Sequence, residues 1–290
     1  MNEKFATFTL FLFSILTFSQ IQIKVLDKNN KKPIPYAKLI LRGKNDYRNT
    51  EENGEVTLEK GEEIYEIESF GYEKLNVSKQ ENTYYLKPKF KEIEEVEIAK
   101  PTFRETFTVG STKKDNFGFM GSQTSWSVVD FFENNHTEKK LFIKKIKIPT
   151  EVKEGKPDAV FNLVFHENIN GKSSLEKLKN VIVSCKKGKN ITEIDFSKNP
   201  ITMPKEGLFI GVEWIINEQN HYLAKMTKIN PDGSKEENAI VDRINPFFYG
   251  YQTKTSNTFS SSKSNWFKMF DGKENIIPPH HLSMELELTN

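Results

Sequence analysis

Five histidines are the residues of this 290-residue chain that could hold a catalytic metal, and their spacing argues against that role. Catalytic zinc takes three protein ligands, and two of them usually share one short element. The segment that starts at His166 begins like a His-Glu-x-x-His motif, but Asn170 stands where the second histidine belongs. His280 and His281 are adjacent, so a strand would point them to opposite faces. We therefore expect no metal and no cofactor, and we expect solvent-exposed histidines, which are His136, His166, His221, His280 and His281.

Serine and carboxylate patterns do not form a recognisable catalytic constellation either. The residues around Ser122 read Gly-Phe-Met-Gly-Ser-Gln, which lacks the Gly-x-Ser-x-Gly elbow of a hydrolase. No glycine loop of the phosphate-binding type occurs. Glu213 shares a strand face with Phe209 and Ile215, so we expect it at a sheet edge or paired, in a structural role. The chain is predicted not to be an enzyme, although Glu213 or Asp195 meeting a histidine in a pocket would favour a hydrolase.

Aromatic side chains offer the best candidate ligand contacts, because sugars stack on exposed rings beside a few polar groups. Trp214 lies on an apolar strand face and Trp126 alternates with apolar residues, so both are assigned to the core. Trp266 lies among serine, lysine and asparagine, where it could form a binding platform or plug the end of a β-sandwich. The candidate ligand-binding residues are Trp266, Phe267, Tyr249 and Tyr251.

The elements that must position these side chains are predicted to be β-strands. Apolar residues alternate with polar ones over 159–166, 208–216 and 282–289, which is typical of strands with one buried face. We expect about ten strands after residue 101. A change of apolar parity at Lys144-Lys145 predicts a β-bulge. Ser173 and Glu176 have capping-box spacing, which predicts a short helix there.

Composition limits the class of protein and its partners. The chain is 36% hydrophobic, 12% aromatic and 28% charged, which indicates a folded protein with a polar surface. Its length favours two domains. Lys+Arg 42 against Asp+Glu 40 leaves no basic excess for a phosphate backbone or a strongly anionic membrane surface. Nucleic acid is therefore excluded as an expected partner.

The amino-terminal segment predicts export. Phe5–Phe18 is an apolar run of signal-peptide length, short for a membrane span. Thr17 and Ser19 are small residues suited to cleavage before Gln20, so 1–19 is predicted to be a signal peptide. An uncleaved anchor is the alternative. The predicted location is the periplasm, the outer-membrane surface or the extracellular space, with no stable membrane span after cleavage.

Cys185 is the single cysteine, so no internal disulfide can form. It shares parity with Val181 and Val183, which predicts a small buried hydrophobe rather than a reactive thiol. Core packing alone must then hold the folded chain together.

Residues 20–100 carry turn motifs in a fixed order. They are Pro33-Ile34-Pro35-Tyr36-Ala37, the Gly54 turn, Ser69-Phe70-Gly71-Tyr72 and a closing Glu-Glu-Val-Glu-Ile at 94–98. This set resembles the carboxypeptidase-like regulatory domain, a transthyretin-like β-sandwich. The resemblance implies a non-catalytic binding or scaffolding module, of the kind found beside metallopeptidases, in outer-membrane receptors and in secreted envelope proteins. Residues 101–290 look like the β-rich segment, without assigned activity, that follows this module in some secreted proteins.

These observations predict an all-β chain with three parts. They are a signal peptide at 1–19, a carboxypeptidase-like regulatory domain at 20–100, and a larger β-sandwich or jelly-roll-like domain of unknown function at 101–290. The predicted function is a non-catalytic binding or scaffold protein of the bacterial cell envelope that contacts protein or glycan partners. The alternatives are a carbohydrate-binding accessory protein and a hydrolase with an unrecognised site in the second domain.

Overall fold

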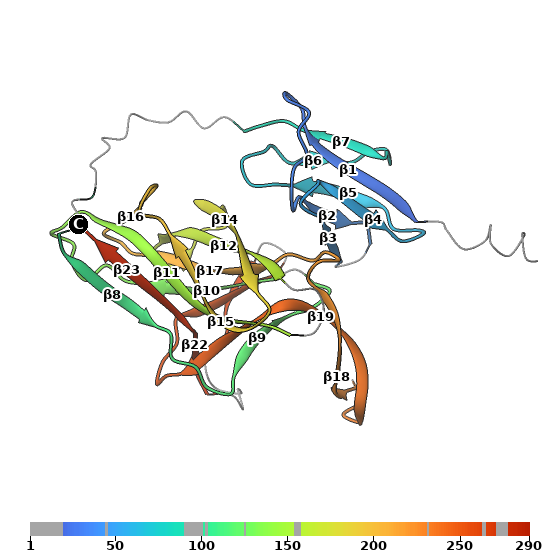
Figure 1. The fold of residues 1–290 in the computed structure, drawn as a ribbon. Coiled ribbons are helices and arrows are strands. Elements are labelled where there is room, and N and C mark those ends of the chain that lie inside the picture. The colour runs from blue at the N-terminus through green and yellow to red at the C-terminus, as the bar shows by residue number, and fades with distance from the viewer. Residues whose placement is uncertain are drawn as a thin grey trace, which may run out of the picture. The chain divides into compact units, whose positions relative to one another are not determined.

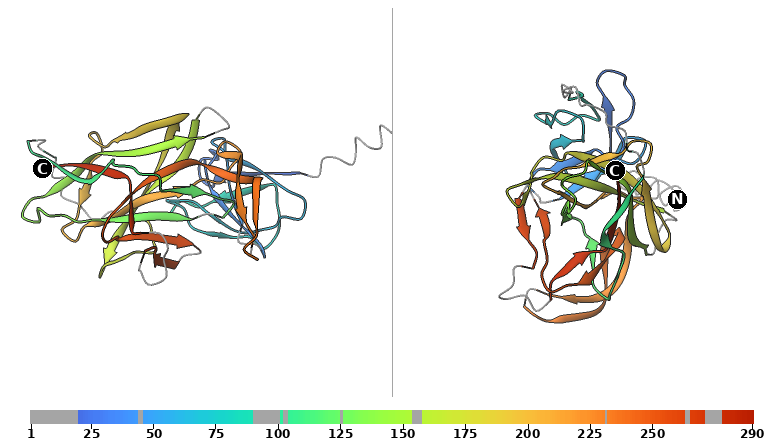
Figure 2. Two further views of the ribbon diagram at one scale, coloured as in Figure 1. Left: turned by 90° about the horizontal axis from the view of Figure 1, so that it is seen from below. Right: turned by 90° about the vertical axis from the view of Figure 1, so that its left-hand side faces the viewer.

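A computed structural model describes residues 20–43, 46–89, 101, 104–124, 126–153, 158–230, 232–262, 265–270 and 278–290. The chain divides into two compact units, Met1–Phe90 (unit 1) and Lys91–Asn290 (unit 2). Over the described residues every regular element is a β-strand (Figure 1, Figure 2), which confirms the predicted all-β, sandwich-like fold. In that part of the chain no helix has the length and hydropathy to cross a bilayer. The predicted signal peptide and the segment 94–98 lie outside the described residues.

Unit 1 is a sandwich of two small sheets. One sheet has the order β4-β1-β7 and the other β3-β2-β5-β6, and β1 pairs with β7 in parallel. Alternate side chains from both sheets, such as Val25 and Leu39, meet in one buried core. The strands are β1 (Ile21–Asp27), β2 (Lys38–Leu41), β3 (Tyr47–Asn49), β4 (Glu55–Leu58), β5 (Ile64–Glu68), β6 (Leu75–Asn76) and β7 (Thr83–Leu86).

Two turns of unit 1 explain why its sequence motifs have these residue types. Gly54 has a φ of 74°, and a Cβ atom there would lie 2.8 Å from the carbonyl oxygen of Val25. Thr50 is fully buried, and its hydroxyl accepts the Ala37 N–H at 2.9 Å and donates to the Ile34 carbonyl at 3.0 Å. The hydroxyl thus satisfies main-chain groups that the turn after Pro33 leaves without strand partners.

Unit 2 contains two larger sheets. The seven-stranded sheet has the order β13-β12-β17-β10-β20-β21, with β14 also on β12. The nine-stranded sheet has the order β18-β19-β11-β23-β8, with β15 and β16 on β11 and with β9 and β22 on β19. The strands are β8 (Thr106–Ser111), β9 (Gly118–Gly121), β10 (Ser127–Phe132), β11 (Leu141–Val152), β12 (Asp158–Ile169), β13 (Lys172–Ser173), β14 (Lys179–Lys186), β15 (Gly188–Asp195), β16 (Ile201–Met203), β17 (Leu208–Trp214), β18 (His221–Ile229), β19 (Lys235–Gln252), β20 (Thr258–Ser262), β21 (Asn265–Lys268), β22 (His280–Leu282) and β23 (Met284–Thr289).

Aromatic side chains between the two sheets form the main core of unit 2. The ring of Phe248 on β19 lies 4.9 Å from that of Phe161 on β12 and 5.2 Å from that of Trp214 on β17. Trp214 is buried, which confirms its assignment to the core, and its Nε1–H donates to the Pro246 carbonyl at 2.7 Å. Trp126 is half-buried and stacks on the Trp214 ring at 4.7 Å.

Local features of unit 2 both confirm and correct the sequence predictions. The register of β11 shifts between Ile143 and Lys145, which confirms the predicted bulge. Cys185 on β14 is buried, as predicted, and burial raises the pKa of its thiol to about 12. The short helix predicted from Ser173 and Glu176 is wrong: Ser173 ends β13, and the five residues before β14 form a loop too short for a helix. The strands exceed the roughly ten expected, because strands as short as β13 have no readable alternation.

Candidate functional site

The central strand of the seven-stranded sheet, β17, is buried on both faces, since all seven of its residues are buried. On the face turned away from the nine-stranded sheet, one row of paired residues crosses five strands from Asn162 to Trp266. In a flat sheet a strand spacing of about 4.8 Å would place the ends of this row roughly 19 Å apart. Instead, the Trp266 ring lies 5.1 Å from that of His166 on β12, and its Nε1–H donates to the Ser174 carbonyl at 3.1 Å.

The sheet must therefore curl, so that β21 returns over β12 on this side. We call this side the curled face. Its side chains are Asn162, Val164 and His166 of β12, Phe209 and Glu213 of β17, Ser127, Val129 and Phe131 of β10, Phe259 and Ser261 of β20, and Trp266 of β21. The curl also corrects the expectation of strands with a single buried face, because it covers the second face of β17 with other parts of the same sheet.

The curled face has an apolar centre. Val129, Val164 and Phe209 form a buried cluster, and the half-buried rings of Phe259 and Trp266 pack against it together with Phe131. The rings of Phe209 and Phe259 meet edge to face at 5.4 Å. These contacts make the middle of the curled face apolar.

A chain of polar side chains runs beside this centre and ends at Glu213. The Glu213 carboxylate forms an ion pair with Lys177 from the loop between β13 and β14, and its side chain is only 8% exposed. It also accepts from the Asn162 amide at 3.4 Å, and the Asn162 carbonyl oxygen accepts from the Asn180 amide at 3.0 Å. Glu213 thus lies paired on a central strand, and of the two positions expected for it the structure shows the paired one.

His166 completes the cluster, although we expected it to be exposed. Its side chain is buried, and its Nδ1 lies 2.9 Å from the Ser174 carbonyl oxygen. Burial, with a further contribution from the Lys177 charge, lowers the pKa of His166 to about 4. Its Nε2 is buried and has no hydrogen-bond partner among the described residues. His166 is therefore a neutral ring that is enclosed within the curled face.

The described residues do not place an activated nucleophile beside His166. Lys177 neutralises Glu213, and no described hydroxyl or thiol is hydrogen-bonded to His166 Nε2 as an activated nucleophile would be. Glu213 does lie close enough for its charge to affect the His166 pKa, so the sequence criterion for a hydrolase is met in part. Within the described residues, no group of three acidic, histidine or cysteine side chains could hold a metal ion.

A second polar network lies where β10, β20 and β22 meet. The buried Asp130 carboxylate accepts from the Thr258 hydroxyl and, at 2.7 Å, from the Leu282 N–H. His281 Nδ1 lies 3.3 Å from the same carboxylate. Desolvation lowers the pKa of His281, but the hydrogen bond and charge of Asp130 outweigh it and raise the pKa on balance.

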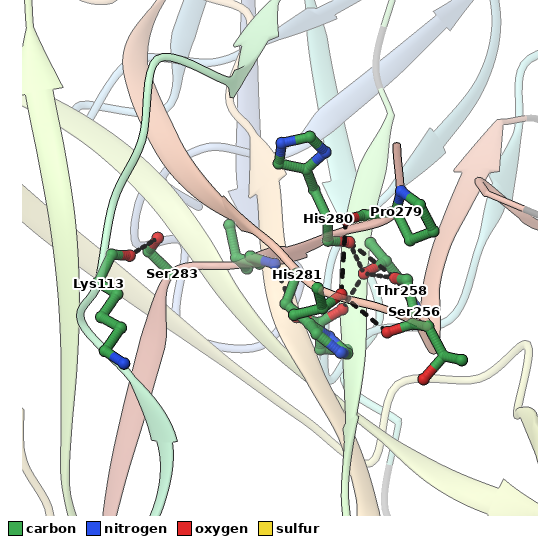
Figure 3. A network of polar contacts seen from close by, with 11 residues as sticks. Lys113, Ser256, Thr258, Pro279, His280, His281 and Ser283 are labelled. Atoms are coloured by element: carbon green, nitrogen blue, oxygen red, sulfur yellow. Dashed lines mark hydrogen bonds and ion pairs between the residues drawn. The ribbon is translucent and has the colours of Figure 1, made fainter. Parts of the chain in front are cut away.

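The hydroxyl groups of this network are turned away from the imidazole rings (Figure 3). The Ser256 hydroxyl donates to the main-chain carbonyl of His280 at 2.7 Å, and the Thr258 hydroxyl, which bonds Asp130, lies 2.8 Å from the same carbonyl. Nearby, the Ser283 hydroxyl donates to the Lys113 carbonyl. His280 itself is buried, contrary to expectation. Because these hydroxyls bond main-chain oxygens or the Asp130 carboxylate and not a ring nitrogen, the network joins three strands and does not assemble a nucleophile with a base.

The four candidate ligand-binding aromatics lie in different environments. Trp266 is half-buried on the curled face, whereas its neighbour Phe267 is 52% exposed and points to the other side of β21. Tyr249 on β19 is buried, and its hydroxyl donates to Glu151 at 2.6 Å. Tyr251 lies beside His281, with ring centroids 5.7 Å apart. The structure thus places only Trp266 on the curled face.

Sequence reasoning missed the polar partners of Trp266. Asn162 and His166 alternate with core residues on β12, which is a polar pattern on a strand that is buried on both sides. That pattern was the available signal, since buried polar residues need partners or a function. The sequence around Lys177 and Asn180 gives no sign of a site, because Lys177 lies in a loop and Asn180 lies on an edge strand.

Comparisons with known proteins do not assign the chain to a family. No family model and no curated protein matches it. Among solved structures, it is similar to the cysteine protease and lectin-like domains of Cwp84, a surface layer associated protein of Clostridium difficile, with a TM-score of 0.35 and 11% identity. The match covers 61% of this chain and 37% of that chain. A likeness of this size carries no argument about fold or function.

Proposed function

We propose that this protein is an exported, non-catalytic binding protein of the bacterial cell envelope, and that unit 2 binds a glycan on the curled face. The observation that carries the proposal is the convergence of the Trp266 indole with His166 and with the polar chain that ends at Glu213. An aromatic ring beside amide, carboxylate and imidazole groups is the combination that sugar-binding sites use.

Two features of the sequence support the remaining parts of the proposal. The apolar run Phe5–Phe18 supports export, and the motifs of residues 33–72 support a module of the carboxypeptidase-like regulatory type. Such a module implies scaffolding in the envelope rather than catalysis. Unit 1 would then provide attachment or contact with a protein partner, while unit 2 holds the glycan.

The test is retention of the purified chain, residues 20–290, on a panel of immobilised envelope and plant polysaccharides. We expect one class of polysaccharide to retain the protein. Trp266→Ala should weaken its binding about tenfold or more, because it removes the ring against which the sugar packs. Tyr65→Ala is the matched control, since Tyr65 is an aromatic of unit 1 that is 51% exposed, and this variant should bind like the wild type.

Three outcomes would contradict the proposal. If no polysaccharide of the panel retains the protein, the proposal of a glycan ligand is wrong. If the Trp266 and Tyr65 variants lose equal affinity, the curled face is not the binding site. Release of shortened sugar from a retained polysaccharide would show a hydrolase and would overturn the non-catalytic assignment. Thermal melting of each variant checks that the loss of binding is not a loss of folding.

A further inference from the structure

We propose that the side chains of Lys177 and Asn162 become joined by an amide bond, with Glu213 carrying the proton between them. This isopeptide bond forms once in each molecule and uses only side chains of this chain, so it requires no bound ligand. It is independent of the proposed glycan binding, and it turns over no outside substrate. The bond gives a covalent cross-link to a chain whose single cysteine can form no internal disulfide.

Glu213 holds the amine and the amide on the same oxygen atom. Asn162 on β12 and Glu213 on β17 are direct cross-strand partners on the curled face. Glu213 Oε2 forms the ion pair with Lys177 Nζ, and it accepts from Asn162 Nδ2 at 3.4 Å. Lys177 approaches from the surface with its side chain 30% exposed, whereas the Glu213 side chain is 8% exposed and Asn162 is buried. The nucleophile and the leaving group therefore meet at one buried carboxylate.

The loop that carries Lys177 is fixed to β12 on both sides of this lysine. Before it, the Ser174 N–H donates to the Glu167 carbonyl at 2.9 Å, and the Ser174 hydroxyl accepts from the Glu167 N–H at 3.1 Å. After it, the Leu178 N–H donates to the Phe165 carbonyl at 2.8 Å. Fixing two reacting groups in this way removes much of the entropy cost of their encounter and gives them a high effective concentration.

The carbon that the amine attacks is Cγ of Asn162, and Asn180 polarises its carbonyl group. Asn180 Nδ2 donates to Asn162 Oδ1 at 3.0 Å. Attack at Cγ places negative charge on this oxygen, and a donor that already points at it stabilises that charge. The apolar centre of the curled face lies beside the amide, since Val164 follows Asn162 on the same face of β12. Apolar surroundings strengthen these electrostatic contacts.

The proposed reaction conserves atoms and charge. Lys177 transfers one proton from Nζ to the Glu213 carboxylate, and the neutral amine attacks Cγ of Asn162. The Nζ–Cγ bond forms while the carbonyl electron pair moves to Oδ1. Glu213 then gives its proton to Nδ2, the carbonyl re-forms, and the Cγ–Nδ2 bond breaks to release ammonia. The surplus proton of Nζ passes through Glu213 to the ammonia, so the products are one secondary amide and one ammonium ion.

Intact mass spectrometry of the purified chain, residues 20–290, is the first test. We expect a mass that is lower than the sequence mass by one ammonia molecule. The full sequence mass would show that Lys177 and Glu213 form only an ion pair, and it would overturn the proposal. A deficit of one water molecule would place the bond on the Glu213 carboxylate instead of Asn162, which would also contradict it.

Tryptic digestion of the unfolded wild-type chain locates the bond without any variant. Trypsin does not cleave after an acylated lysine, so the chain should stay intact after Lys177. Tandem mass spectrometry should then find residues 154–172, which contain Asn162, joined to residues 173–179. Recovery of 173–177 as a separate peptide, in place of the joined product, would refute the bond.

Variants test the role of each side chain. Lys177→Arg and Glu213→Gln should both show the full sequence mass, because the first lacks the primary amine and the second cannot take up its proton. Lys179→Arg is the matched control and should keep the ammonia deficit, since the Lys179 amine lies over the Phe196 ring, 5.9 Å from its centroid. A deficit that persists in Glu213→Gln would contradict the proton transfer. If this variant does not fold, the peptide map of the wild type still decides whether the bond exists.

Thermal melting measures what the bond contributes to the fold. Lys177→Arg keeps the positive charge but cannot form the bond, which in the wild type closes the loop from residue 162 to residue 177. We expect its melting temperature to lie about 5–10 °C below that of Lys179→Arg. Equal melting temperatures, together with full mass in the wild type, would show that Lys177 acts through its charge alone.

Discussion

Asp130→Ala should lower the free energy of unfolding of unit 2 by about 3–5 kcal/mol. The buried carboxylate accepts from the Thr258 hydroxyl and from the Leu282 N–H, and it faces His281 at 3.3 Å. Its loss leaves the buried Leu282 N–H without an acceptor, at about 1–3 kcal/mol, and removes the counter-charge of the His281 imidazole, as when a buried ion pair loses one partner. The site is enclosed by three strands, so water cannot easily replace the carboxylate.

Urea unfolding followed by tryptophan fluorescence measures this loss for unit 2 alone. All three tryptophans, Trp126, Trp214 and Trp266, lie in unit 2, since unit 1 ends at residue 90. Asp195→Ala is the matched control, because Asp195 is exposed and its carboxylate accepts from Ser197. We expect little change in the control. A loss below about 1 kcal/mol for Asp130→Ala would refute the assignment of this network as the link between the three strands.

The same network predicts a pH dependence. Asp130 raises the pKa of His281 above its unfolded value of about 6.5, so the folded state binds the proton more tightly. The resulting stability is fully present below pH 6.5 and is lost as pH rises through the folded pKa. In Asp130→Asn this decline should disappear, because the charge that holds the proton is gone. A decline of the same size in the variant would contradict the argument.

Three further predictions concern other parts of the fold. Gly54→Ala should destabilise unit 1 by about 1–3 kcal/mol more than Gly43→Ala. Both glycines have a positive φ, but only at Gly54 would a Cβ atom lie 2.8 Å from a main-chain oxygen. Hydrogen exchange of unit 1 amides measures the difference in stability. Thr50→Val should accelerate the same exchange, with a cost of about 1–3 kcal/mol, since the buried Ala37 N–H loses its acceptor. Trp214→Phe should lower the unfolding free energy of unit 2 by about 1–3 kcal/mol, read from the urea midpoint, since it leaves a buried carbonyl without its donor.

The features that could be predicted from the sequence are those that alternation along one strand determines. The parity of β17 placed Trp214 in the core, and the parity change in β11 located the bulge near Lys145. The same parity gave Glu213 a place among buried side chains, and an acidic residue there must find a partner. Each of these conclusions needs only the period-2 geometry of an extended chain.

The curled face could not be predicted in the same way, because it depends on contacts between segments far apart in the sequence. Trp266 meets Ser174 across 92 residues, and only the curl of a whole sheet brings them together. The loop that holds Lys177 was misread because Ser173 and Glu176 match a helix start locally. In the structure, pairing with β12 takes Ser173 into a strand, and tertiary pairing outweighs a local capping preference.

Alkylation of the buried Cys185 thiol reports local unfolding of the protein. Its Sγ donates to the Ala159 carbonyl at 3.4 Å, and its pKa of about 12 keeps it out of the reactive thiolate form. As the chain has a single sulfhydryl, a molecule that takes up one alkylating group has exposed Cys185, which is paired with Ala159 of β12, at least once. The rate of alkylation across urea concentrations then distinguishes fraying of this strand pair from unfolding of the whole unit. The opening rate of β14, the strand that carries Asn180, can thus be measured without an engineered label.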